Sequence, residues 1–208
     1  MFEGKSFLDI IQIGGATMYV LLCCSLVSIS IFLERIYYYR KQSRGSCADF
    51  IDRLGAAISR NEIGKAEEIA VATAMPCSRV IQSALKLHGR PEKSMAGAME
   101  RAIIAETREL ARFTSIVGTI GNIGVYIGLF GTVLGIVRAF HDISATGVGG
   151  ISTVIEGVGE ALVCTAAGLF VAIPAVVFFN YFTHRVERFE DDMRLCASEF
   201  LEMLKGNQ

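Results

Sequence analysis

The chain has no tryptophan, three prolines and three histidines among its 208 residues, and its formal charge is nearly balanced at −1. The charge balance gives no sign of a nucleic-acid-binding surface, which would need an excess of clustered Lys and Arg. The sequence contains no Ser/His/Asp arrangement, phosphate-binding loop or zinc-ligand spacing. Its six cysteines lack CxxC spacing and nearby histidines, so we interpret them as small apolar residues. No enzyme activity, metal or cofactor is expected.

Charge is also missing from three long windows, Ile10–Leu33, Phe113–Val137 and Ala161–His184, which contain no Asp, Glu, Lys or Arg. Each window reaches the roughly 20 residues that a helix needs to cross the hydrocarbon of a bilayer. The alternative is a soluble core of three buried helices, but a chain this short has few residues left to cover them. The windows therefore predict three transmembrane helices.

The positions of Lys and Arg predict the orientation of these helices. Most of the 20 basic residues lie between Arg35 and Arg112, and most of the others follow Thr183. The N-terminus has only Lys5, and the connection between the second and third windows has only Arg138. By the positive-inside rule, the N-terminus lies outside and the C-terminus inside. The cations follow the first window instead of preceding it, so this window is interpreted as a retained anchor.

We therefore expect an all-α membrane protein in which long helical extensions reach into the cytoplasm. Proline-free helical periodicity predicts one continuous helix from about Pro91 to about Phe140. Asn61 is expected to cap a short helix and Pro76 to begin another. The expected segments are a periplasmic N-terminus (1–9), transmembrane helix 1 (10–34), a cytoplasmic helical domain (35–112), transmembrane helix 2 (113–140), a periplasmic loop (141–157), transmembrane helix 3 (158–183) and a cytoplasmic C-terminal helix (184–208).

Small residues form one face of each of the last two predicted spans. In the second span they are Gly118, Gly121, Gly124, Gly128, Gly131 and Gly135, and in the third they are Ala161, Thr165, Gly168, Ala172 and Ala175. Such faces let helices approach to backbone contact. Thr132 lies at the edge of the first face and Thr165 on the second. Each hydroxyl could bond its own helix backbone. As a pair on small-residue faces, they are candidates for the polar lining of a channel in a ring of chains.

Glu160 is predicted at the outer mouth of the third span, with Glu156 one turn earlier. A carboxylate near hydrocarbon usually faces protein or a water-filled cavity, but acidic residues also suit a solvated helix N-terminus. We favour the solvated interpretation for Glu156 and leave both open for Glu160. Neither span carries Asp, Glu, Lys, Arg or His at mid-depth. If protons cross the membrane here, another polypeptide must supply the titrating carboxylate.

Two sequence runs in these spans resemble a known family. The run YIGLFGTVLGI (126–136), followed by GEALVCTAAGL (159–169) and AIPA (172–175), resembles the paired signature of the MotA/TolQ/ExbB proton-channel family. Glu34 and Arg35 at the end of the first span fit ExbB-like members, and the resemblance covers nearly the whole chain in layout. One departure is that Gly124-Val125-Tyr126 stands where the family commonly has a proline shortly before the second-span motif.

The resemblance implies an energy-transducing subunit of the bacterial inner membrane. It implies a pentamer around two copies of a single-span ExbD- or TolR-like protein, whose membrane Asp carries the proton. The threonines matching Thr132 and Thr165 would lie near that Asp, and the carboxylate matching Glu160 is implicated too. A TonB- or TolA-like protein and the lipid bilayer are the other implied partners. The expected helix-packing residues are Gly121, Gly124, Gly128, Gly131, Gly135, Ala161, Gly168, Ala172 and Pro174.

Several functions remain as alternatives. We favour an ExbB-like subunit that powers outer-membrane import over a TolQ-like subunit that maintains the envelope, because of the outer N-terminus and the pattern from Met18-Tyr19 to Glu34-Arg35. Three spans instead of four argue against a flagellar stator. From other classes, a small-solute secondary transporter and a structural helix scaffold are possible. Transporters generally need broken helices or polar pockets at the midplane, which this sequence does not predict.

Overall fold

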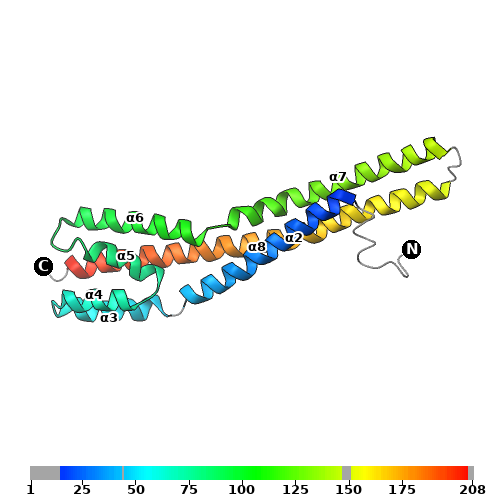
Figure 1. Cartoon of the computed structure of the whole chain (residues 1–208). Coiled ribbons are helices and arrows are strands. Elements are labelled where there is room, and N and C mark those ends of the chain that lie inside the picture. The colour runs from blue at the N-terminus through cyan, green and yellow to red at the C-terminus, as the bar shows by residue number, and fades with distance from the viewer. Residues whose placement is uncertain (1–14, 44, 147–150, 206–208) are drawn as a thin grey trace. The chain divides into compact units, whose positions relative to one another are not determined.

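The computed structural model of the chain describes residues 15–43, 45–146 and 151–205 and contains only helices there, with no strand. The helices are α2 (Gly15–Gln42), α3 (Cys47–Ser59), α4 (Ile63–Ala72), α5 (Pro76–Leu85), α6 (Glu92–Leu110), α7 (Thr114–Thr146) and α8 (Ile151–Lys205) (Figure 1). Three helical stretches, in α2, α7 and α8, are long and apolar enough to cross a membrane. The predicted all-helical fold with three such helices is confirmed. The expected N-terminal segment 1–9 lies outside the described residues.

The chain forms two compact units, which we call the apolar unit and the polar unit. The apolar unit comprises Met1–Leu33 and Phe113–Tyr181, and the polar unit comprises Glu34–Arg112 and Phe182–Gln208. Helices α2 and α8 contribute residues to both.

In the apolar unit, α2 packs on α8 through a few large side chains. The rings of Phe32 and Phe178 stack with their centroids 3.9 Å apart, and Met18 and Leu21 cluster with Cys164. Many other large apolar side chains of the unit are exposed, among them Tyr19, Leu26, Tyr126, Leu129, Phe130, Val137, Leu162, Phe170 and Ile173. A soluble protein would bury such residues, whereas a lipid-facing surface favours them.

In the polar unit, short amphipathic helices enclose an apolar core. The side chain of Ser46 caps α3 by accepting a hydrogen bond from the backbone N–H of Asp49. The ring of Tyr39 is almost fully buried against Phe182 and Phe189, with centroid distances of 5.9 Å to each. The rest of the core comes from α3, α5, α6 and the end of α8, and includes Leu54, Ile58, Ile81, Met99, Ile103, Met193 and Phe200.

The predicted continuous helix from Pro91 to Phe140 is wrong, because α6 ends at Leu110 and α7 begins at Thr114. Between them, Phe113 has a φ of 65°, in the left-handed region that a helix cannot include. No glycine or proline marks this break, and the 3.6-residue periodicity runs through it.

The end of α6 is stabilised by side chains from α2. The guanidinium of Arg35 donates hydrogen bonds to the carbonyls of Glu109, at 3.0 Å, and Leu110, at 3.4 Å. The Tyr39 hydroxyl donates to the Leu110 carbonyl at 2.9 Å. These carbonyls are among the last four of the helix, which lack partners in the helix itself. Arg35 is only 2% exposed, and this buried cation is stabilised both by the Glu34 carboxylate, which accepts from its Nη2 at 2.7 Å, and by the helix end that it caps.

Two smaller predictions also need correction. Asn61 has a φ of 58° and precedes the N-cap residue of α4, which is Glu62. The expected loop over 141–157 is largely helical, since α7 continues to Thr146 and α8 starts at Ile151; residues 147–150 lie outside the described residues. Helix α5 begins at Pro76, as predicted, and α8 continues to Lys205.

Candidate functional site

The small-residue faces of α7 and α8 lie against each other in a single chain. A Cβ atom placed on any of five α7 glycines would meet α8 within 3.3 Å. The nearest α8 residues are Val176 for Gly121, Ala172 for Gly124, Cys164 and Gly168 for Gly128, Cys164 for Gly131, and Ala161 for Gly135. Along the contact, the residue numbers decrease in α8 as they increase in α7, so the two helices are antiparallel.

The contact is closest around Gly128 and Gly168. A Cβ on Gly128 would lie 2.8 Å from the carbonyl oxygen of Cys164 and 3.0 Å from the Cα of Gly168. A Cβ on Gly168 would in turn lie 2.8 Å from the carbonyl oxygen of Gly124. These neighbours are backbone atoms that cannot swing away, so only glycine fits. The two small-residue faces predicted from the sequence are therefore packed against each other within one chain.

Pro174 lies outside this contact. Ala172 and Ala175, on either side of it, are buried, whereas Pro174 is exposed. Helix α8 continues through it, although a proline removes one backbone hydrogen bond of the helix. Its position is therefore on the outer side of α8.

The two predicted hydroxyl residues flank the same point of the α7–α8 contact. Gly131 meets Cys164, and Thr132 and Thr165 are the next residues of the two helices. With a rise of 1.5 Å per residue in antiparallel helices, they differ in depth by only about 3 Å. Thr132 is 6% exposed and its hydroxyl donates to the Leu129 carbonyl at 2.6 Å. Thr165 is half-buried.

A third hydroxyl that the sequence reasoning missed lies at this depth. Thr17 of α2 is 8% exposed, and its Oγ1 lies 3.8 Å from the Cys164 sulfur, to which it donates. The same oxygen would lie 2.9 Å from a Cβ on Gly131. Thr17 is not part of a small-residue face, so no pattern in the sequence distinguished it. Three helices thus bring a hydroxyl to one level of the apolar unit.

Glu160 lies apart from this group. It is half-buried and precedes Thr165 by five residues, which is about 7.5 Å along the helix axis and about 140° around it. Its carboxylate is therefore on another side of α8, nearer the connection to α7. The side chain of Glu156 lies outside the described residues.

Comparisons with known proteins agree with the sequence signatures. A family model for the MotA/TolQ/ExbB proton channel family matches residues 72–195, which include most of α7 and α8. An ExbB homolog of Methanothermobacter thermautotrophicus is 31% identical over 90% of this chain and 67% of its own length. An ExbB-like protein of Synechocystis sp. is 31% identical, over 81% of each protein.

A similarity to TolQ is also present. The Tol-Pal system protein TolQ of Pseudomonas aeruginosa is 38% identical over 54% of this chain. The match covers 48% of the length of TolQ. ExbB-type and TolQ-type relatives are therefore both similar to this chain, and identity alone does not separate them.

Proposed function

Because this chain belongs to the MotA/TolQ/ExbB proton channel family, we propose that it is an ExbB-like subunit of a proton-driven motor in a bacterial inner membrane. In this proposal five copies form a ring around two copies of an ExbD-like single-span protein. The motor transmits energy to a TonB-like protein for import across the outer membrane. The family is one of proton channels and transport energisers and not a known enzyme family.

The orientation in this proposal follows from charge. The polar unit carries most of the Lys and Arg residues, so it lies in the cytoplasm by the positive-inside rule. The connection between α7 and α8 then lies in the periplasm. Glu160, near that connection, is placed toward the periplasmic entrance of the proton path.

The observation that carries the proposal is a level of the apolar unit with three hydroxyls, within long stretches of α7 and α8 that contain no charged residue or histidine. No Asp, Glu, Lys, Arg or His lies between Phe113 and Val137 or between Ala161 and Thr183. Thr132 and Thr165 mark one level within these stretches. A hydroxyl offers two acceptor lone pairs besides its one donor. After Thr132 has donated to its own helix, its oxygen can still accept a bond from water or from a protonated carboxyl.

A partner carboxylate at this depth would complete a proton path. Proton entry from outside neutralises the membrane Asp of one ExbD-like chain, and its protonated carboxyl donates to a threonine oxygen of the ring. Loss of that proton to the cytoplasm restores a charge that hydrocarbon disfavours. Alternate protonation of the two partner Asp residues would change which ring face each one prefers and so drive rotation of the ring against the partner.

The double variant Thr132→Val with Thr165→Val tests the hydroxyl role. Valine keeps the shape and removes the oxygen. A protonated carboxyl would then lose its acceptor, and we expect proton-dependent import to fall at least about tenfold, which corresponds to about 1.4 kcal/mol. Import would be measured in cells at matched protein level. Thr119→Val, at an exposed hydroxyl of α7 that bonds its own helix, is the control. Unchanged import in the double variant would remove the hydroxyls from the mechanism.

Co-purification tests the motor itself. Full-length protein extracted in mild detergent should carry a single-span protein with an Asp in its membrane segment. An associated TonB-like protein supports the ExbB-like role, and a TolA-like protein would replace it with the TolQ-like role. If the chain purified without a single-span partner and catalysed solute counterflow alone in vesicles, it would be a transporter and the motor proposal would be abandoned.

A further inference from the structure

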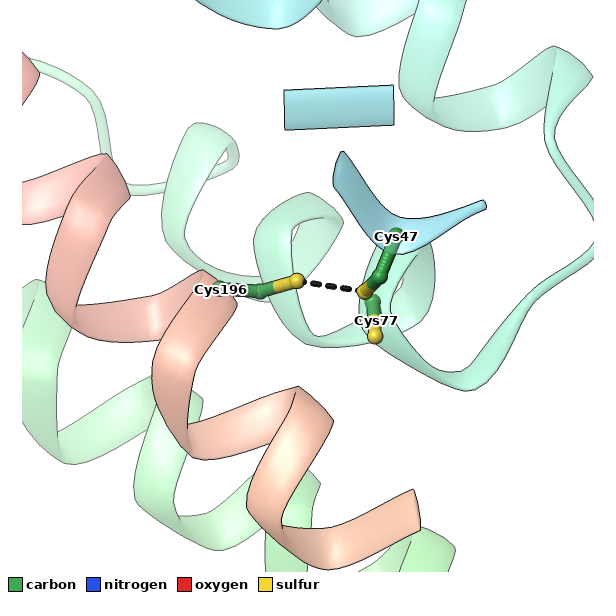
Figure 2. Close-up of side chains that lie close together, drawn as sticks. All are labelled: Cys47, Cys77 and Cys196. Atoms are coloured by element: carbon green, nitrogen blue, oxygen red, sulfur yellow. Dashed lines mark hydrogen bonds between the residues drawn. The ribbon is translucent and has the colours of Figure 1, made fainter. Parts of the chain in front are cut away.

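Three cysteines far apart in the sequence meet in the polar unit. The sulfur atoms of Cys47, Cys77 and Cys196 all lie within 4.8 Å of one another, and those of Cys47 and Cys196 are 2.7 Å apart. All three are free thiols. Figure 2 shows their side chains converging from three different helices. The interpretation of these cysteines as separate apolar filler residues does not account for this arrangement.

The local structure favours the thiolate form that metals bind. Cys47 is the first residue of α3 and Cys77 the second residue of α5, so both lie at helix N-termini, whose partial positive charge stabilises a thiolate.

The cluster also has an approach from solvent and further donor atoms. A cleft of about 90 Å³ is lined by Cys47 and Cys77, and also by Met75 and Asp192. Asp192 precedes Cys196 by four residues, so it lies on the same face of α8. A water molecule in the cleft, which the Asp192 carboxylate also lines, can provide a fourth ligand. An approach route and a plausible ligand set are what a metal site requires.

We propose that Cys47, Cys77 and Cys196 form a binding site for a thiophilic d¹⁰ metal cation, Zn²⁺ or Cu⁺, in the polar unit. Tetrahedral zinc with Zn–S bonds of about 2.3 Å separates its sulfur ligands by about 3.8 Å. The sulfur atoms of Cys47 and Cys196, 2.7 Å apart, are closer than that value, and no pair of the three is more than 4.8 Å apart, about 1 Å beyond it. Small side-chain rotations are therefore enough to form the site. Cu⁺ is also compatible, because thiolate ligands select it.

The bound cation would tie three elements together. It would link the start of α3, the start of α5 and the last third of α8, each of which contributes one ligand. These helices belong to the same unit, so the site would stabilise that unit internally. The inference rests on the sulfur geometry and does not depend on the proposed motor function.

Metal titration of the full-length protein tests the site. Reduced, metal-free protein in detergent is titrated with Zn²⁺ in one arm and with Cu⁺ under argon in the other. We expect one equivalent of Zn²⁺ or Cu⁺ per chain to bind, and the arm with the tighter binding identifies the preferred cation. Co²⁺, used as a coloured substitute for Zn²⁺, should give the absorption of tetrahedral thiolate coordination. The bound metal should also slow alkylation of these three thiols and not of Cys23, which mass spectrometry can map residue by residue.

Variants localise the binding. Cys47→Ser removes the least buried of the three ligands and is the variant least expected to disturb folding. Changing a neighbour of a metal ligand typically weakens binding 10- to 100-fold, so loss of a ligand should weaken it at least about 100-fold. Cys23→Ser, at an exposed cysteine of the apolar unit, should bind like the unchanged protein. Circular dichroism confirms that each variant is folded.

Three results would overturn the proposal. One is the absence of stoichiometric binding of either cation by the reduced protein. Another is equal affinity of the Cys47→Ser variant and the unchanged protein. The third is a disulfide between Cys47 and Cys196 in protein alkylated under acid immediately on cell lysis, because it would show a redox pair and not a metal site.

Discussion

The two units of this protein hold their helices together by opposite means. In the apolar unit, the closest helix contact has almost no side chains, since Gly128 and Gly168 bring backbone against backbone. In the polar unit, a buried guanidinium and a phenol hold the end of α6, and large apolar residues fill the core. In lipid, the hydrophobic effect contributes little to helix association, so the helices are held together by close van der Waals packing. Water favours burial of large residues and tolerates charges.

The largest expected effect tests the glycine contact. Gly128→Ala places a methyl group 2.8 Å from the Cys164 carbonyl oxygen, which cannot move aside, and we expect a cost of about 3 kcal/mol, the upper end of the usual range for overpacking. Gly64→Ala in α4 is the matched control, because nothing lies within 4 Å of its new methyl group. Thermal unfolding in detergent should show a lower melting temperature for the first variant only. Equal melting temperatures for the two variants would contradict the backbone contact.

The next effect belongs to the polar unit. Arg35→Ala leaves the carbonyls of Glu109 and Leu110 without the charged donor that caps them, and we expect about 2–3 kcal/mol of destabilisation. Tyr39→Phe removes one neutral hydrogen bond and should cost about 1 kcal/mol. Faster amide hydrogen exchange near the end of α6 would accompany both. The exposed Arg53→Ala is the control; if it destabilised the protein as much as Arg35→Ala, the capping role would be wrong.

The smallest effect is expected on the surface of the polar unit. Arg194 forms ion pairs with Glu190, at 3.0 Å, and Glu100, at 3.2 Å, but all three side chains are at least one-third exposed. Solvent screens such pairs. Arg194→Ala should leave the melting temperature within experimental error at physiological salt. A clear drop in melting temperature that disappears at high salt would contradict this prediction, because it would show that these surface ion pairs stabilise the polar unit.

The sequence predicted those features that depend on residues close together in the chain. The charge-free windows predicted three long apolar helices, and the spacing of glycines indicated which face of α7 would pack closely. Pro76 correctly marked the start of α5. Each of these signals lies within one helix, so periodicity and composition are enough to detect it.

The features that the sequence reasoning missed depend on residues distant in the chain. The break before α7 occurs at a phenylalanine, and its supporting donors Arg35 and Tyr39 lie more than seventy residues away from the carbonyls that they cap. Thr17 joins the hydroxyl level only because α2 packs on α8. Cys47, Cys77 and Cys196 have no motif spacing, because three separate helices bring them together. No pattern within a single helix shows which distant residues the fold brings into contact.

The contact between α7 and α8 has a consequence for how the protein is made. Because the α7 glycines contact α8 of the same chain, a newly inserted chain can close this helix pair without a second copy. In the proposed ring, the surface available for contacts between copies would be formed by large residues such as Tyr126, Phe130 and Phe170, which are exposed in the single chain. Formation of the proposed ring would then have two stages, in which each chain first completes its own helical hairpin and the copies associate afterwards.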